Sequence, residues 1–247
     1  MFKAFLIFLF LSLLTFTRVY NLDRTARFIW DESSDLVRMH QFFVERKITL
    51  IGPIDETGTK IFSSLTYYML MPFAILGNFD PVSPVFGSAF WGILTAVLII
   101  YLTYLINKKF VLVTALLVLV WFPLVETSRW AWNPNLIPFW ATLGILFFQF
   151  KGKLKMFVAG IFLGFTIHSH YLSLFALSGF IGSLIIFSFK EKIFKNVVWI
   201  ITGIVVTLVP FVIFDLRHPP GLFLTRIMFF SPSAGSESLV AALIKLK

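Results

Sequence analysis

Charge-free apolar runs constrain this chain more than any other feature of its sequence. The runs cover residues 4–17, 61–78, 82–107, 110–125, 136–150, 156–189 and 196–214. A helix needs about 20 apolar residues to cross a hydrocarbon core of roughly 30 Å, and a soluble surface helix would carry a polar stripe that these runs lack. With 58% hydrophobic and 13% charged residues, the sequence predicts an all-α polytopic membrane protein.

Two of the runs do not fit a single span. As one helix, residues 156–189 would be about 51 Å long, so we expect two shorter helices that turn near His168 to Tyr171. Residues 61–78 contain two tyrosines and a proline and are typical of a helix that lies along the membrane interface. These assignments predict about seven transmembrane helices and a first outer loop that is helical and interfacial.

Lysines between the runs predict the orientation, because short loops rich in Lys and Arg stay in the cytoplasm. If residues 61–78 do not cross, one side receives Lys3, Lys108, Lys109, Lys151, Lys153, Lys155, Lys190, Lys192 and Lys195. The N-terminus of this multi-pass protein of the plasma or inner membrane is then cytoplasmic, and the loop 18–83 is extracytoplasmic. The extracytoplasmic side as a whole receives nearly all acids and histidines. If residues 61–78 crossed, the loop 18–60 would be inside and the N-terminus outside.

Composition and missing motifs exclude several function classes. The net charge of +9 is spread between apolar runs, whereas a nucleic-acid groove needs one basic patch with interleaved aromatic residues. The chain has no cysteine, so disulfides and thiolate sites are excluded. It also lacks a phosphate-binding glycine loop, an HExxH motif and a nucleophile elbow, which argues against an ATPase, a protease and a hydrolase.

The first outer loop carries the acids best placed for chemistry. Asp31 and Glu32 precede Ser33 at the start of a stretch whose apolar residues recur at helical spacing. Asp35 follows Asp31 by four residues, which places both carboxylates on one helix face. One interpretation is helix capping by Asp31 or Ser33. The other is a general base, since lipid and a second carboxylate raise the pKa of a carboxyl group.

Later outer segments supply cations and further donors. Arg129 and Asn133 lie in a Trp-rich turn, where they could hold a substrate phosphate or a phospholipid headgroup. Asp215, Arg217 and His218 follow the last run, either as interfacial anchors or as part of one site with the first-loop acids. Their predicted position on the same side as those acids favours a shared site.

Metal binding stays open. His168 and His170, at the expected turn, form a pair that is more often structural than metal-ligating, because no third ligand has suitable spacing. Asp31 and Glu32 could also bind a divalent cation, with water completing its coordination shell. The sequence therefore indicates no certain cofactor, and the metal is unknown.

Several short motifs occur along the chain in a fixed order. They are Trp30-Asp31-Glu32 with Asp35, Ile51-Gly52-Pro53 through Gly58 to Leu65-Thr66-Tyr67-Tyr68 and Pro72-Phe73, Ser128-Arg129-Trp130-Ala131-Trp132-Asn133-Pro134-Asn135, His170-Tyr171, and Phe214-Asp215-Leu216-Arg217-His218. This ordered set resembles prokaryotic phospholipid-carrier-dependent glycosyltransferases of the protein O-mannosyltransferase and aminoarabinose-transferase type, members of the GT-C superfold. The resemblance extends over essentially the whole chain and rests on the combination, since no motif is specific alone.

The resemblance implies a GT-C-like transmembrane module over residues 1–218, with 18–83 as its first extracytoplasmic loop. Residues 219–247 are expected to begin a further extracytoplasmic segment that is truncated here, because members of this family are usually longer. One departure is that the family often has Gly-Pro before the tyrosines, where this chain has Ser63, Ser64 and Leu65. We therefore expect the interfacial helix to differ in shape.

The family's reaction moves a sugar from a polyprenyl-phosphate carrier to an acceptor hydroxyl, with inversion, on the extracytoplasmic side. By resemblance Asp31 matches the family's catalytic base, with Glu32 beside it. The expected substrate-binding residues are Asp35, Tyr67, Tyr68, Arg129, Asn133, His170, Asp215, Arg217 and His218. The implied partners are the lipid-linked sugar, membrane lipid and an acceptor glycan, lipid or protein, without nucleic acid.

Two other classes stay open. A transporter or lipid flippase normally carries ionisable residues or broken helices at mid-membrane depth, and the apolar runs show none apart from the histidine pair. An inactive membrane subunit would differ from the enzyme only in the role of the first-loop acids.

Overall fold

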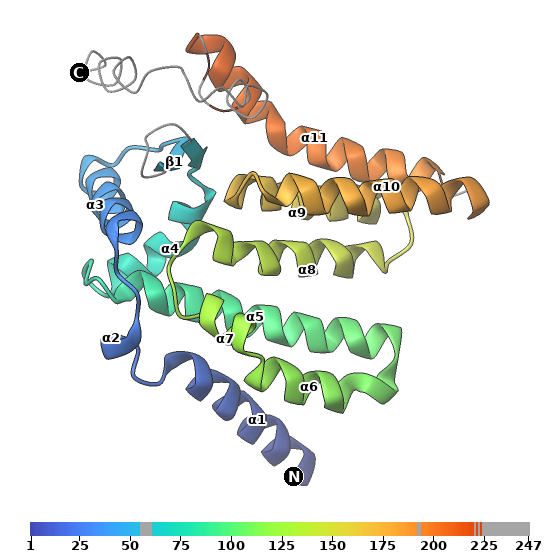
Figure 1. The fold of residues 1–247 in the computed structure, drawn as a ribbon, viewed down its shortest axis with the longest axis horizontal. Coiled ribbons are helices and arrows are strands. Elements are labelled where there is room, and N and C mark those ends of the chain that lie inside the picture. The colour runs from blue at the N-terminus through green and yellow to red at the C-terminus, as the bar shows by residue number, and fades with distance from the viewer. Residues whose placement is uncertain (55–60, 192–193, 220, 222, 224–247) are drawn as a thin grey trace.

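The computed structural model describes residues 1–54, 61–191, 194–219, 221 and 223, and these are mainly helical (Figure 1). The helices are α1 (Phe2–Val19), α2 (Leu22–Thr25), α3 (Trp30–Glu45), α4 (Leu65–Leu76), α5 (Ser83–Ile106), η1 (Lys108–Phe110), α6 (Val111–Val120), α7 (Phe122–Thr127), η2 (Asn133–Leu136), α8 (Ile137–Phe148), α9 (Lys153–Ser169), α10 (Ser173–Glu191) and α11 (Phe194–Arg217). Two short strands, β1 (Ile51–Ile54) and β2 (Ile61–Ser63), pair antiparallel.

The long helices run side by side, and their connections gather at two ends (Figure 1). We call the end with the α5–α6 and α8–α9 turns, residues 107–110 and 149–152, the lysine end. The opposite end, called the loop end, holds α2, α3, the strand pair and the C-terminus of α11. Helix α4 starts and finishes at the loop end, where it packs on α3, β1 and α5. This arrangement agrees with the prediction that residues 61–78 do not form a span.

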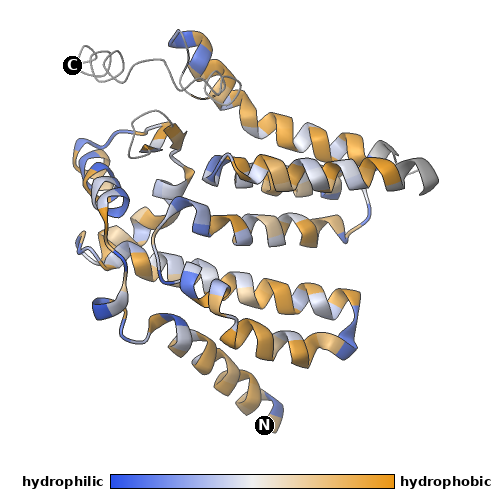
Figure 2. Cartoon of the chain, in the orientation of Figure 1, coloured by the Kyte–Doolittle hydropathy of each residue, from blue (hydrophilic) through white to orange (hydrophobic). Residues whose placement is uncertain are grey.

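The long helices consist mostly of hydrophobic residues (Figure 2). Large side chains such as Phe8, Leu112 and Val205 are exposed, as expected where lipid replaces water as solvent. Among the described residues, three helical segments are long and apolar enough to cross a bilayer: Phe2–Thr25, Ser83–Ile106 and Asn196–Arg217. These features support a membrane protein with an all-α fold.

The seven predicted spans differ from the observed helix lengths in several places. The run 110–125 is divided at Trp121 into α6, of 10 residues, and the short α7, which has Pro123 in its first turn. Helix α8 has 12 residues, fewer than the roughly 20 needed for a full span. The turn expected near His168 to Tyr171 is confirmed, because α9 ends at Ser169 and α10 begins at Ser173.

The first loop contains helices, as predicted, and also a strand pair that was not predicted. Residues Ile61–Ser63, expected at the start of the interfacial helix, form β2 and pair with β1. Helix α4 begins after them, at Leu65. Helix α1 also extends to Val19, so Arg18 lies inside the helix and not in the loop.

Arg18 is fully buried between α1 and α6. Its guanidinium donates to the Val118 carbonyl oxygen at 2.5 Å, to the Leu14 carbonyl oxygen at 3.3 Å and to the Thr17 hydroxyl at 2.8 Å. A buried cation is costly unless hydrogen bonds satisfy it. These carbonyl contacts therefore make Arg18 a link between two helices and not a loop cation.

Candidate functional site

The loop end brings together three predicted acids on one helix. We call Asp31, Glu32 and Asp35 the acidic cluster of α3. The helix starts at Trp30, and the cap uses neither Asp31 nor Ser33: Glu32 Oε2 accepts a hydrogen bond from the Ile29 backbone N–H at 2.9 Å. Carboxylates in a first helical turn also interact favourably with the helix dipole. The capping prediction is correct in kind but assigns the wrong residue.

Glu32 also reaches the second outer turn. Its Oε1 accepts a hydrogen bond from Trp130 Nε1, and Glu32 is only 4% exposed. Nearby, Arg27 pairs with Glu126 at 2.5 Å and lies 4.9 Å above the Trp130 ring. Trp130 in turn stacks on Trp132, with centroids 4.5 Å apart. Both oxygens of Glu32 are thus held by N–H donors, and its carboxylate joins α3 to the turn 126–135.

Asp35 joins the acidic cluster to α4. Asp35 is 6% exposed, and its Oδ1 accepts a hydrogen bond from Tyr67 Oη at 2.7 Å. Arg38 Nη1 lies 4.0 Å from the same oxygen. Burial raises the pKa of Asp35 to about 7, with Asp31 and Glu32 adding to the rise, while Tyr67 and Arg38 lower it. A carboxyl group with this pKa exchanges its proton near neutral pH.

The predicted phosphate ligands of the second turn make contacts within the protein. Arg129 donates to the Tyr20 carbonyl oxygen at 2.8 Å, to the Thr17 carbonyl oxygen at 3.4 Å and to the Thr25 hydroxyl. Asn133, which is buried, donates to the Ser169 carbonyl oxygen at 2.5 Å. In this structure both side chains tie the second turn to neighbouring helix ends, so a phosphate would have to displace these contacts.

The third turn, residues 168–173, holds the strand pair in place. His168 Nδ1 lies 2.9 Å from Ser63 Oγ, and His168 Nε2 lies 2.8 Å from the Thr207 carbonyl oxygen. His170 stacks on Phe62 with centroids 4.8 Å apart, and Tyr171 Oη donates to the Ile61 carbonyl oxygen. The structural interpretation of the two histidines is supported by these contacts.

The described residues contain no group of three His, Cys, Asp or Glu side chains that could hold a metal ion. Both oxygens of Glu32 accept protein hydrogen bonds, which leaves little room for a cation shared between Asp31 and Glu32. The divalent cation left open by the sequence thus gains no support from the arrangement of these acids.

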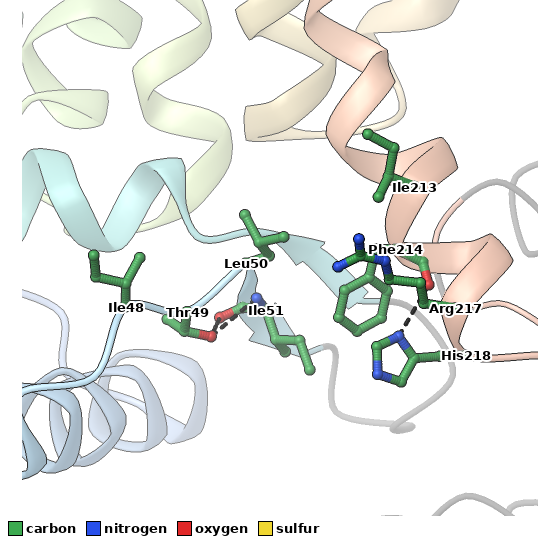
Figure 3. Close-up of a pocket in the computed structure, with 8 residues that line it drawn as sticks. All are labelled: Ile48, Thr49, Leu50, Ile51, Ile213, Phe214, Arg217 and His218. Atoms are coloured by element: carbon green, nitrogen blue, oxygen red, sulfur yellow. Dashed lines mark hydrogen bonds between the residues drawn. The ribbon is translucent and has the colours of Figure 1, made fainter.

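A pocket of about 370 Å³ lies where the first loop meets the end of α11 (Figure 3). We call it the α11 pocket, and its lining residues are Ile48, Thr49, Leu50, Ile51, Ile213, Phe214, Arg217 and His218. Arg217 and His218 project from α11 toward the loop segment (Figure 3). The His218 ring stacks on Phe214 at 4.2 Å. The walls of the α11 pocket are mainly apolar. Arg217 adds one permanent cation and His218 one imidazole.

Helix α4 contacts both the acidic cluster and the α11 pocket. Tyr67 reaches Asp35, whereas Tyr68 Oη donates to the Thr49 carbonyl oxygen at 2.8 Å and accepts from the Thr49 backbone N–H at 2.9 Å. Asp215, at the end of α11, accepts a hydrogen bond from the Phe223 backbone N–H at 3.0 Å. The predicted site residues thus share one end of the protein but do not form a single contact group.

Sequence reasoning missed several residues that shape this end. Trp130 was not among the predicted site residues, yet it binds Glu32. Ser63 and Thr49 were not predicted as contact residues either, although they contact His168 and Tyr68. These partners lie far apart in the sequence. The only available signal was the polar character of Ser63 and Thr49 beside apolar strands.

No protein-family model matches this chain, and no match was found among curated proteins or solved structures. The family resemblance therefore stays a prediction based on its motifs.

Proposed function

We propose that this protein is an integral membrane glycosyltransferase that transfers a sugar from a polyprenyl-phosphate carrier to an acceptor hydroxyl. The observation that carries the proposal is the acidic cluster at the loop end, together with a second site at the same end that has apolar walls, one arginine and one histidine. Transfer needs a base near the acceptor oxygen and positive charge near the leaving phosphate. The loop end supplies residue types suited to both tasks.

We assign the base to Asp31. Glu32 and Asp35 are almost fully buried, which suits them to supporting roles. Asp31 stands one turn before Asp35 on the same helix and is partly exposed. It also matches the first-loop acid of the family that the motifs resemble. A single displacement by the acceptor hydroxyl would invert the anomeric carbon.

The α11 pocket is the proposed site of the lipid phosphate. Its apolar residues suit an isoprenoid chain, and Arg217 with His218 would hold the phosphate oxygens by charge-assisted hydrogen bonds. Arg217 is favoured over Arg129 for this role, because Arg129 donates to Tyr20 and Thr25. The lysine end would face the cytoplasm and the loop end the outside, with about seven spans in all.

A transfer assay with isolated membranes tests the proposal. Membranes that contain the full chain are incubated with radiolabelled polyprenyl-phosphate sugars, and label is followed into lipid, protein and glycan fractions. Asp31→Asn is expected to lower transfer by roughly 10²- to 10⁴-fold, the usual contribution of a general base. Asp23→Asn is the matched control, because Asp23 is an exposed acid on α2.

The outcomes separate the competing classes. Label that reaches an acceptor in wild type and Asp23→Asn but not in Asp31→Asn supports the enzyme. Label that only changes leaflet would instead indicate a flippase, and wild-type transfer retained by Asp31→Asn would remove Asp31 from the mechanism. Label that stays in the carrier in its original leaflet would indicate an inactive subunit.

A further inference from the structure

Asp35 and Tyr67 form a polar link inside an apolar contact between α3 and α4. Tyr67 is 1% exposed and Asp35 is 6% exposed. Around them, Leu36 and Met39 of α3 and Leu70 of α4 belong to one buried cluster. Water therefore cannot easily replace the 2.7 Å hydrogen bond between Tyr67 Oη and Asp35 Oδ1, and loss of either partner would leave a buried polar group unsatisfied.

The charges that face Asp35 come from two helices. On α3 they are Asp31 and Glu32, both acids, and Arg38, whose Nη1 lies 4.0 Å from Asp35 Oδ1; α4 contributes the phenol of Tyr67. Within two turns of α3, the single cation Arg38 therefore accompanies three carboxyl groups, those of Asp31, Glu32 and Asp35. Ionisation of Asp35 adds repulsion between its carboxylate and the two neighbouring acids, and it places a charge in a buried position.

We propose that Asp35 and Tyr67 are positioning residues, which hold the acid-bearing turns of α3 against α4 and so align Asp31, and that ionisation of the buried Asp35 loosens this alignment. This role rests on the proposed function, because Asp31 is the base of that reaction. Asp35 does not touch the substrate in this scheme. It acts through the position of Asp31. The Tyr67 hydrogen bond and Arg38 favour the carboxylate, but burial and the neighbouring acids outweigh them, so ionisation of Asp35 loosens the contact between α3 and α4.

The direction in which the pKa of Asp35 shifts predicts how transfer should depend on pH. Burial raises the pKa of Asp35 to about 7, so the proton is lost as pH rises through neutrality. Transfer should then fall on the alkaline side of neutral pH. Asp35→Asn keeps an oxygen acceptor for Tyr67 but cannot ionise, and this alkaline loss should be reduced at least about 3-fold in the variant. Tyr67→Phe removes the donor and should lower kcat at every pH.

The experiment uses the full chain in membranes and in detergent. Transfer is measured from about pH 5 to about pH 9 for wild type, Asp35→Asn, Tyr67→Phe and the surface control Asp23→Asn, with kcat and KM for the donor separated. Thermal unfolding of the same proteins is followed over the same pH range. The proposal expects a flatter kcat profile and a flatter Tm profile for Asp35→Asn, with KM unchanged and Asp23→Asn like wild type.

The results distinguish this inference from the proposed function. Absence of transfer in wild type contradicts the proposed function, and with it the alignment of a base. Wild-type transfer with an alkaline loss that Asp35→Asn fully retains contradicts the positioning role alone. A folded Asp35→Asn protein whose main change is a higher KM would also overturn it, because Asp35 would then bind substrate directly.

Discussion

The acidic cluster of α3 and the α11 pocket lie at the same end of the protein, yet they are built differently. In the cluster, Glu32 and Asp35 are almost fully buried and have partners on other elements. In the pocket, Arg217 and His218 are exposed and stand at the rim of an apolar space. Buried, paired groups hold a structure together, whereas exposed cations beside apolar walls can receive a ligand. We therefore expect substitutions in the cluster to change stability and those in the pocket to change binding.

The largest difference is expected between the two adjacent tyrosines of α4. Tyr67→Ala removes a buried ring and the hydrogen bond to Asp35, and should cost about 3–5 kcal/mol of unfolding free energy. Tyr68 is 42% exposed and bonds to the backbone of Thr49, so Tyr68→Ala should cost about 1–2 kcal/mol. Denaturant unfolding in detergent measures both, and equal losses would contradict the contrast in burial.

The second effect is a pH dependence that only the cluster should show. Because burial raises the pKa of Asp35 from 3.8 to about 7, the folded state binds this proton more tightly than the unfolded state. Its contribution to stability is therefore lost as pH rises from about 4 to about 7. At about 1.4 kcal/mol per pKa unit, the change is on the order of 4 kcal/mol.

The difference between wild type and Asp35→Asn isolates this contribution from all other titrating groups. Asp35→Asn should gain stability relative to wild type as pH increases, when Tm is measured in detergent at several pH values. A constant difference between the two proteins across that range would show that Asp35 has an ordinary carboxyl pKa.

Glu32 should have a smaller effect. Glu32→Gln keeps the shape of the side chain but leaves a single acceptor oxygen, so it can keep only one of the hydrogen bonds from the Ile29 N–H and from Trp130. A loss of about 1 kcal/mol is expected, together with a change in tryptophan fluorescence as Trp130 moves. Glu45→Gln, at the other end of α3 and exposed, is the control and should behave like wild type.

Arg217 should have the smallest effect on stability. Arg217→Ala is expected to shift the unfolding free energy by no more than about 0.5 kcal/mol, because the side chain is exposed. The KM for the lipid-linked donor should rise by about 10-fold or more, since a charge-assisted hydrogen bond contributes about 1.5–3 kcal/mol. Arg24→Ala, another exposed arginine, controls for net charge. An unchanged KM would show that the α11 pocket does not bind the donor.

Sequence periodicity predicted the elements that depend on local composition. The apolar runs mark most helices, the excess length of residues 156–189 predicted the break between α9 and α10, and helical spacing after Trp30 located α3. The strand pair was missed because β1 and β2 have only 4 and 3 residues. Strands this short carry no clear alternation.

Contacts within the site depend on long-range packing and were harder to predict from the sequence. The cap of α3 was assigned to Asp31 or Ser33, whereas the Glu32 side chain makes the bond, and its link to Trp130 joins residues 98 positions apart. Arg18 was placed in the first loop because it follows the apolar run, but α1 continues and buries it against Val118. No spacing rule specifies partners at such distances along the chain.

Cysteine accessibility across the membrane tests the central claim most directly, because the chain has no native cysteine. The variants Asp31→Cys, Arg217→Cys, Lys109→Cys and Lys151→Cys are made singly in the full chain and treated on intact cells with a membrane-impermeant thiol reagent. The account predicts labelling at positions 31 and 217 from outside, and labelling at 109 and 151 only after the membrane is opened. Labelling of positions 31 and 217 from opposite faces would contradict it.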